Sequence, residues 1–273
     1  MRVRSSVEIG QFAERYNYLA GISREGWAWE HLRRHPEFIR EAYQHQNAVS
    51  RIEGCRSVKL LKLRRPMPEA EKWGLICFPH PDQRAIDAEV FWSCDQYPRQ
   101  IEVMVTPNTD GKIDQIFEET VRVCRVKHLI DARGGEHLRI QGKCCSIQVR
   151  CHGLSLISGD PVRMDYKISG VRDFEEKVKI MQAAKVVYGD HTDKPIPFTT
   201  EGERRRNGLM ALDARQAGLS LSGIAKLIFG ETRVREEWGR DGRWMKDRVR
   251  GYIASATRLM EGGYRKLLMP KRG

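Results

Sequence analysis

The sequence has no stretch that approaches the roughly 18 uninterrupted apolar residues needed for a membrane-spanning helix. Its first residues, which include Arg2 and Arg4, are not followed by the apolar segment of a secretory signal. The seven cysteines form no Cys-x-x-Cys pair, and an odd number of cysteines without a secretory signal favours free thiols over a disulfide framework. We therefore expect a protein that stays in the cytoplasm and makes no membrane contact.

Nucleotide-binding motifs are also missing. Neither Gly-x-x-x-x-Gly-Lys-Ser/Thr nor Gly-x-Gly-x-x-Gly occurs, so nucleotide-dependent activity has no support. An activator with a sigma-54-type ATPase is thereby excluded.

Candidate metal ligands gather in the middle of the chain: Cys124, His128, Cys144, Cys145, Cys151 and His152. Cys144 and Cys145 would point to opposite faces of a strand, so both could not readily bind one ion, and buried thiols are the favoured interpretation. Asp131, Glu136 and His137 could form an acid and base cluster, but their spacing matches no nuclease mechanism. We expect no metal, no cofactor and no enzyme activity.

Positive charge is abundant and unevenly distributed. The 273 residues carry a formal net charge of +12. Residues 201–273 hold 17 Lys and Arg against 9 Asp and Glu, whereas residues 1–200 hold 31 against 27. A basic excess on one small unit is typical of a protein that binds a polyanion, because each neutralised phosphate releases condensed counterions. A mildly basic, solvated surface is the alternative that composition leaves open.

The periodicity of apolar residues changes twice along the chain. Helical periodicity over the first 50 residues is interrupted at His35-Pro36, because proline pushes the preceding residue out of the α region. Alternation with a period of two then predicts strands at 101–105, 120–126 and 147–151. Helical periodicity returns after Gly170.

This order of blocks predicts an α+β fold. We expect a helical N-terminal domain at residues 1–85, a small antiparallel β unit at 86–185 and a C-terminal domain at 186–273. A proline-punctuated stretch between Arg64 and Pro81 is interpreted as a connection.

The C-terminal domain has the pattern of a helix-turn-helix. A helix ending at Gly218 is followed by a short helix at 223–229, capped by Ser220 or Ser222 and ending at Gly230. After a connector, a long helix from about 243 to 260 has its apolar members on one side: Met245, Val249, Tyr252, Ile253, Ala256 and Met260. In a helix-turn-helix, a short helix braces a longer one whose N-terminal side chains enter the major groove.

The basic residues of this domain are the candidate DNA contacts. Arginine suits guanine O6 and N7, so we assign base contacts to the residues at or near the start of the long helix: Arg240, Arg243, Lys246 and Arg250. Phosphate contacts are assigned to Arg204, Arg205, Arg206, Lys226 and Arg248. Asp247 could accept from cytosine N4, or it could pair with Arg243 or Arg250 one turn away. Trp244 could pack against a neighbour or stack on nucleic acid.

Several motifs resemble one bacterial family. They are Leu212-Asp-Ala-Arg-Gln-Ala-Gly-Leu-Ser220, Ile224-Ala-Lys-Leu-Ile-Phe-Gly-Glu231, Lys246-Asp-Arg-Val-Arg250 and Gly262-Gly-Tyr-Arg-Lys-Leu-Leu268. This part of the chain is similar to the C-terminal DNA-binding domain of RovC-type transcription factors. Gly26-Trp-Ala-Trp-Glu-His-Leu-Arg-Arg-His-Pro-Glu-Phe38 is similar to the N-terminal domain that accompanies it, and Phe91-Trp92 and Gly135-Glu-His-Leu138 match the family's central β portion.

The resemblance implies a homo-oligomer, with a hexamer as one candidate assembly, that activates type VI secretion genes from promoter DNA, with RNA polymerase as a candidate partner. Lys246, Arg248 and Arg250 match the family's basic motif one by one, whereas Gly251 stands where a further basic residue is usual. Two alternatives stay open. One is a regulatory module that represses another regulator without touching DNA, and the other is an architectural factor for excision of an integrative element.

Overall fold

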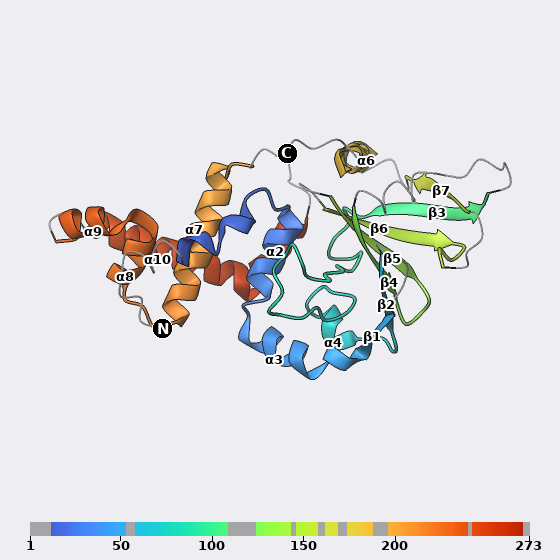
Figure 1. The fold of residues 1–273 in the computed structure, drawn as a ribbon, viewed down its shortest axis with the longest axis horizontal. Helices are drawn as coiled ribbons and strands as arrows, with labels where there is room; N and C mark the ends of the chain where they lie inside the picture. Colours follow the sequence, from blue (N-terminus) through green and yellow to red (C-terminus); the bar gives the residue numbers. More distant parts are fainter. Residues whose placement is uncertain are drawn as a thin grey trace. The chain divides into compact units, whose positions relative to one another are not determined.

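The computed structural model of the chain describes residues 12–52, 58–108, 124–142, 146–157, 162–168, 174–187, 196–239 and 242–269. The α+β class is confirmed: N-terminal helices, a seven-stranded sheet and a C-terminal helical region follow one another along the chain (Figure 1). Among the described residues, no helix combines the length and the apolarity that crossing a membrane requires.

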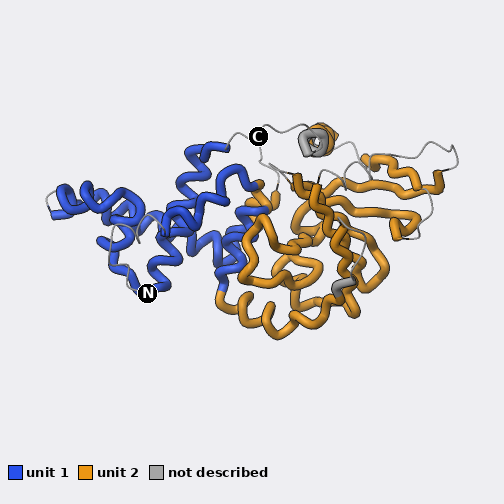
Figure 2. Tube along the Cα trace, in the orientation of Figure 1, with its two compact units in different colours: residues 1–22, 26–35, 194–264 blue, residues 23–25, 36–193, 265–273 orange. Residues whose placement is uncertain are grey.

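The chain divides into two compact units (Figure 2). Unit 1 consists of Met1–Ile22, Gly26–His35 and Lys194–Tyr264, and unit 2 consists of Ser23–Glu25, Pro36–Asp193 and Arg265–Gly273. Unit 1 therefore combines residues from the first 35 positions with a segment of the last third of the chain. The division into domains at residues 85 and 185 stays a prediction.

Unit 1 is helical. Its described N-terminal part includes a 3-10 turn, Asn17–Leu19, and most of α2 (Arg24–Leu32), whose indoles Trp27 and Trp29 are both buried. Its C-terminal part consists of α7 (Thr200–Gln216), α8 (Leu221–Phe229), α9 (Glu231–Glu237), α10 (Arg243–Arg258) and a π-helical turn, Leu259–Gly263. Helix α9 occupies the stretch that the sequence pattern predicts as a connector.

A serine and two glycines set the ends of these helices. The Ser220 hydroxyl accepts a hydrogen bond from the backbone N–H of Gly223 at 3.1 Å, so Ser220, and not Ser222, caps α8. Gly218 after α7 and Gly230 after α8 have φ angles of 84° and 88°, which a residue with a Cβ rarely adopts. The two predicted helix ends are confirmed.

Helix α10 packs against α7 and α8 through its predicted apolar stripe. Met245, Val249 and Ala256 are buried, and Leu212 of α7 joins Ala256 and Met260 in one apolar cluster. Burial of this stripe determines which face α10 presents to solvent.

Unit 2 is built on the sheet. Its strands are β1 (Val49–Ile52), β2 (Val58–Leu63), β3 (Ile101–Pro107), β4 (Arg125–Ile130), β5 (Glu136–Gln141), β6 (Ser146–Gly153) and β7 (Val162–Lys167), in the order β1-β2-β4-β5-β6-β3-β7. Its helical segments are α3 (Pro36–Gln44), a turn at Gln46–Ala48, α4 (Pro68–Glu71), α6 (Phe174–Val187) and α11 (Arg265–Leu268). Helix α2 ends before His35 and α3 begins at Pro36, so the predicted break is confirmed.

The sheet is mixed, which corrects the predicted small antiparallel unit. β1 and β2 lie before residue 86, where the predicted β unit begins. β2 pairs in parallel with β4, and β3 pairs in parallel with β6. Two parallel neighbours need a long crossover connection, and in each of these pairs a long stretch of chain separates the first strand from the second. β4, β5 and β6 are consecutive in the chain and pair antiparallel as expected.

The two faces of the sheet are buried differently. One face carries an apolar core that includes Val103, Leu138 and Val149, with Ile180 of α6 packed against it. The other face carries buried polar side chains. Arg139 donates from Nη1 to the backbone oxygen of Val90 at 2.9 Å.

Gln148, on the same face of the sheet, also bonds to the backbone of this segment. It accepts a hydrogen bond from the backbone N–H of Trp92 at 3.0 Å and donates to the Trp92 carbonyl oxygen at 2.7 Å. The hydrogen bonds of Arg139 and Gln148 hold residues 90–92 on the sheet.

Candidate nucleic-acid interface

Helix α10 presents a charged face to solvent because its apolar stripe is buried. The side chains of Arg243 and Arg250 are 96% and 63% exposed. Met245 and Val249 point the other way and are fully buried. Residues i and i+7 lie two turns apart on one side of a helix. The structure therefore brings two of the predicted base-contacting arginines together on one exposed face.

Asp247 lies between these arginines. Its carboxylate is 3.1 Å from Nη1 of Arg250 and 4.0 Å from Nε of Arg243. Asp247 therefore pairs with both of the arginines that the helical spacing predicts as its partners. Exposed pairs of this kind contribute about 0 to 1 kcal/mol. The arginines can therefore leave Asp247 for a base or a phosphate at little cost.

The flanks of α10 carry the other two basic residues of its first turns. Nζ of Lys246 lies 5.2 Å from the ring centre of Trp238, and the guanidinium of Arg248 lies 5.9 Å from the ring centre of Tyr252. Both distances fit cation–π contacts with these rings. The fourth predicted base contact, Arg240, lies outside the described residues.

Helix α8 and the start of α10 share an aromatic contact. Trp244 is 39% exposed, and its ring meets the edge of Phe229 at 5.3 Å between ring centres. The guanidinium of Arg233 lies over the same indole at 5.0 Å. Lys226, a predicted phosphate contact, pairs with Glu231 at 3.1 Å. Trp244 is thus both packed and accessible.

The three consecutive arginines of α7 diverge, because neighbouring positions of a helix are rotated by about 100°. Arg204 is exposed. Arg205 forms an ion pair with Glu201, and Arg206 is half-buried with its guanidinium 4.8 Å from the ring centre of Phe198. The structure does not bring these three predicted phosphate contacts together on one face.

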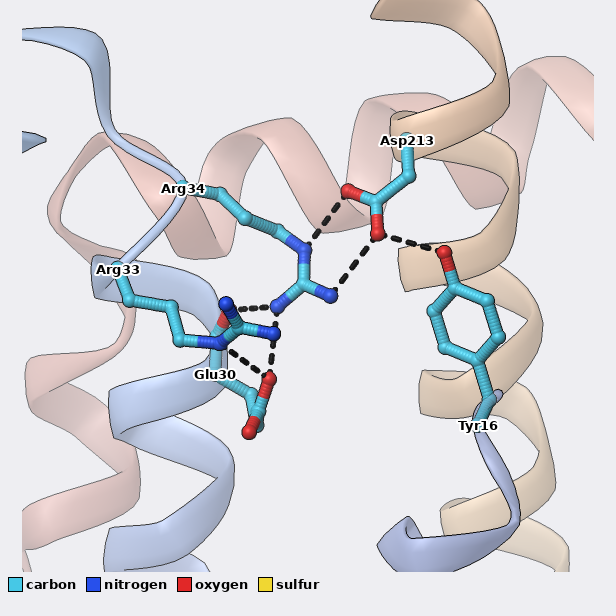
Figure 3. A network of polar contacts seen from close by, with 5 residues as sticks. All are labelled: Tyr16, Glu30, Arg33, Arg34 and Asp213. Atoms are coloured by element: carbon cyan, nitrogen blue, oxygen red, sulfur yellow. Dashed lines mark hydrogen bonds and ion pairs between the residues drawn. The ribbon is translucent and has the colours of Figure 1, made fainter. Parts of the chain in front are cut away.

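Helix α7 is anchored by a network of polar and charged residues that are too far apart in sequence for a local pattern to predict it (Figure 3). Arg34 donates from Nε and Nη2 to the two carboxylate oxygens of Asp213, at 2.7 and 2.9 Å. Tyr16 donates its hydroxyl proton to Asp213 at 2.6 Å. Glu30 accepts from Arg34 at 2.8 Å and from Arg33 at 2.7 Å. The network joins the N-terminal residues of unit 1 to the last turn of α7.

Burial and charge shift the pKa values in this network. Burial by itself would lower the pKa of Arg34, but Asp213 and Glu30 hold it above its ordinary value. Burial and the adjacent Asp213 carboxylate raise the pKa of Tyr16. Both groups therefore keep their protons, and Asp213 is held between two donors.

The acidic and histidine residues of the sheet do not form one site. His137 pairs with Asp131 at 3.0 Å, whereas Glu136 pairs with His128 at 2.9 Å. His137 and Glu136 are neighbours on one strand and so point to opposite faces. Burial lowers the pKa of both histidines. Within the described ranges, no three His, Cys, Asp or Glu residues are placed to hold a metal ion, and Cys144 and Cys145 lie outside those ranges.

Comparison with known protein families finds one match in the N-terminal part of the chain and another in the C-terminal part. Residues 169–269 match the family described as T6SS, transcription factor, DNA-binding domain, of the RovC type. Residues 11–79 match the proteobacterial transcriptional regulator-like domain. No curated protein matches the chain. The chain therefore combines a proteobacterial transcriptional regulator-like N-terminal domain with a RovC-type, T6SS-linked transcription factor DNA-binding domain.

Proposed function

We propose that this transcription factor is a sequence-specific activator of type VI secretion genes, and that α8 and α10 form its helix-turn-helix. The N-terminal half of α10 enters the major groove. The observation that carries the proposal is the exposure of Arg243 and Arg250 on the face opposite buried Met245 and Val249, within the segment matched to the DNA-binding domain.

The base contacts are assigned to the basic residues at or near the start of α10: Arg240, Arg243, Lys246 and Arg250. Arginine can donate two hydrogen bonds to guanine O6 and N7, and each such pair contributes about 1 to 3 kcal/mol of discrimination. Asp247 contacts both guanidinium groups only weakly, so it releases them at little cost when DNA binds. Phosphate contacts are proposed for Arg204, Lys226 and Arg248, and they would fix the position of the protein on the duplex. Arg205 and Arg206 project from other sides of α7 and are left out of this set.

Activation is assigned to a homo-oligomer that acts in the cytoplasm. A single helix-turn-helix contacts few bases, and two copies on half-sites one turn of DNA apart, roughly 34 Å, gain affinity and specificity. A hexamer is one candidate assembly, and RNA polymerase is the candidate partner at the promoter.

Binding to promoter and non-promoter DNA, measured over a range of salt concentrations, tests the assignment. Arg243→Ala and Arg250→Ala should each weaken specific binding by about 1 to 3 kcal/mol, or roughly 5- to 150-fold in Kd. Binding to non-promoter DNA should change little. The matched control is Arg258→Ala, an exposed arginine at the far end of the same helix, which should leave the preference for promoter DNA intact.

Two results would contradict the proposal. If both variants bind the promoter as the unaltered protein does, α10 is not the recognition helix. If the protein shifts no DNA at any salt concentration, the non-DNA-binding regulatory module becomes the better assignment.

A further inference from the structure

Helix α9 brings a basic residue to the start of α10. The guanidinium of Arg233, in α9, lies 5.0 Å from the ring centre of Trp244, the second residue of α10. The same indole meets the edge of Phe229, the last residue of α8, at 5.3 Å between ring centres. One half-packed aromatic side chain thus lies where α8, α9 and α10 meet, and Arg233 is stacked on it.

Trp244 borders the charged face of α10. At 100° per residue, Trp244 lies about 60° from Asp247, which is between the two proposed base contacts, and about 40° from Arg248, a proposed phosphate contact. The buried residues of α10 are on the other side of the helix. Arg233 therefore adds a cation to the flank of α10 that carries Arg248.

The contacts of Arg233 leave its outer N–H groups available. Its Nε donates to a carboxylate oxygen of Glu237 at 2.9 Å, and the two side chains are 54% and 36% exposed. An exposed pair of this kind contributes little to stability. Among the described residues, the structure gives Nη1 and Nη2 of Arg233 no acceptor. A guanidinium held against an aromatic ring keeps a rigid fork of donors that matches a phosphate through two hydrogen bonds.

We propose that Arg233 contacts a phosphate of the bound DNA and that Trp244 positions its guanidinium for this contact. The inference rests on the proposed function, which places the start of α10 in the major groove. A helix in that groove has a sugar-phosphate wall on each flank, and contacts to these walls fix the register of the protein on the duplex. Arg233 belongs to the preceding helix, so it is suited to a wall of the groove and not to the base edges.

The other helix at this junction carries a cation in a comparable place. Lys226 precedes Phe229 by three residues, or about one turn of α8. Lys226, Arg233 and Arg248 therefore come from three helices that meet at Trp244. Helix α9, which the sequence pattern predicts as a connector, becomes part of the DNA interface.

The salt dependence of DNA affinity tests the phosphate contact. Each phosphate contact adds about 0.9 to the slope of log affinity against log salt concentration. Arg233→Ala should lower this slope by about 0.9. It should weaken binding to promoter and non-promoter DNA by the same factor, roughly fivefold or more at about 50 mM salt. The matched control is Arg235→Ala, an exposed arginine on the other side of α9, which should change neither slope nor affinity.

The positioning role of Trp244 predicts that its effect overlaps with that of Arg233. Trp244→Leu keeps an apolar side chain against Phe229 but removes the aromatic face. It should weaken DNA binding, and Arg233→Ala should then add much less than it does alone. Arg233→Lys keeps the charge without the fork of donors, so it should lose affinity and retain the salt slope. The Tm of both Arg233 variants should stay within about 2 °C of the unaltered protein, which excludes misfolding.

Uncharged phosphates locate the contact on the DNA. Replacing the phosphates of the promoter site one at a time with methylphosphonates should reveal one position that weakens the unaltered protein and hardly affects Arg233→Ala. If promoter binding depends on Arg243 but neither the salt slope nor the methylphosphonate pattern depends on Arg233, this proposal alone is overturned. A failure of the proposed function looks different, because Arg243→Ala and Arg250→Ala then leave promoter binding unchanged. A protein that binds no DNA would overturn both.

Discussion

Replacing Asp213 with alanine should destabilise unit 1 through its buried charges. The side chain of Arg34 is 9% exposed and that of Asp213 is 25% exposed. Removing one member of a buried pair costs about 3 to 5 kcal/mol, because the remaining charge stays buried. Glu30 still contacts Arg34 at 2.8 Å and water reaches position 213, so we expect the lower value, about 3 kcal/mol.

Thermal unfolding measures this loss. For a chain of this size, about 3 kcal/mol corresponds to a decrease in Tm of roughly 6 to 12 °C. A double-mutant cycle with Tyr16→Phe adds a second readout. The phenylalanine should cost about 1.5 to 3 kcal/mol alone, since it removes a hydrogen bond to a charged group. It should cost much less once Asp213 is already alanine, because its acceptor is gone.

The control is Gln216→Ala, an exposed position on the same helix, which should change stability by no more than about 0.5 kcal/mol. A loss below about 1 kcal/mol for Asp213→Ala, or full additivity with Tyr16→Phe, would refute the reasoning. It would mean that the network does not join the N-terminal residues to α7.

Three further outcomes are expected. Val249→Ala removes two buried methyl groups beneath the recognition face and should cost about 2 kcal/mol in urea unfolding, whereas the half-buried Ile253 should be less sensitive to truncation. Gly251→Ala should stabilise α10 by about 1 kcal/mol in thermal unfolding, because a Cβ there meets open space and alanine favours the helix. His31 is held neutral, since burial and the nearby Arg34 and Arg205 lower its pKa to about 3. Its contribution to stability is complete above pH 6.5 and is lost as the pH falls toward 3. His31→Gln should therefore make the free energy of unfolding depend less on pH in this acid range. An unchanged pH dependence would contradict a buried, neutral His31.

The C-terminal helices were the most predictable part of the fold. Helix ends at Gly218 and Gly230, the cap at Ser220 and the apolar stripe of α10 are local features, each set by residues within a few positions of one another. The exposure of Arg243 and Arg250 followed from the same stripe, because burying one side of a helix exposes the other.

Long-range features could not be predicted from a single sequence. The parallel pairing of β2 with β4 depends on a crossover whose path leaves no periodic signal. Arg139 and Gln148 occupy the polar positions of alternating strands, a pattern that predicts exposed side chains, but both are buried because they bond to the backbone at Val90 and Trp92. The pairing of Arg34 with Asp213 joins positions 179 residues apart, and nothing in either local sequence distinguishes these charges from exposed ones.

The most direct test of base reading by α10 combines protein variants with a modified base. Replacing a guanine of the promoter site with 7-deazaguanine removes the N7 acceptor and leaves the pairing intact. At the guanine read by Arg243 or Arg250, this change should weaken binding of the unaltered protein by about 1 to 3 kcal/mol. The same change should have almost no effect on the alanine variant of the arginine that reads it, because the lost hydrogen bond is then already absent. If 7-deazaguanine weakens the unaltered protein and both variants equally at every guanine of the site, α10 does not read the bases.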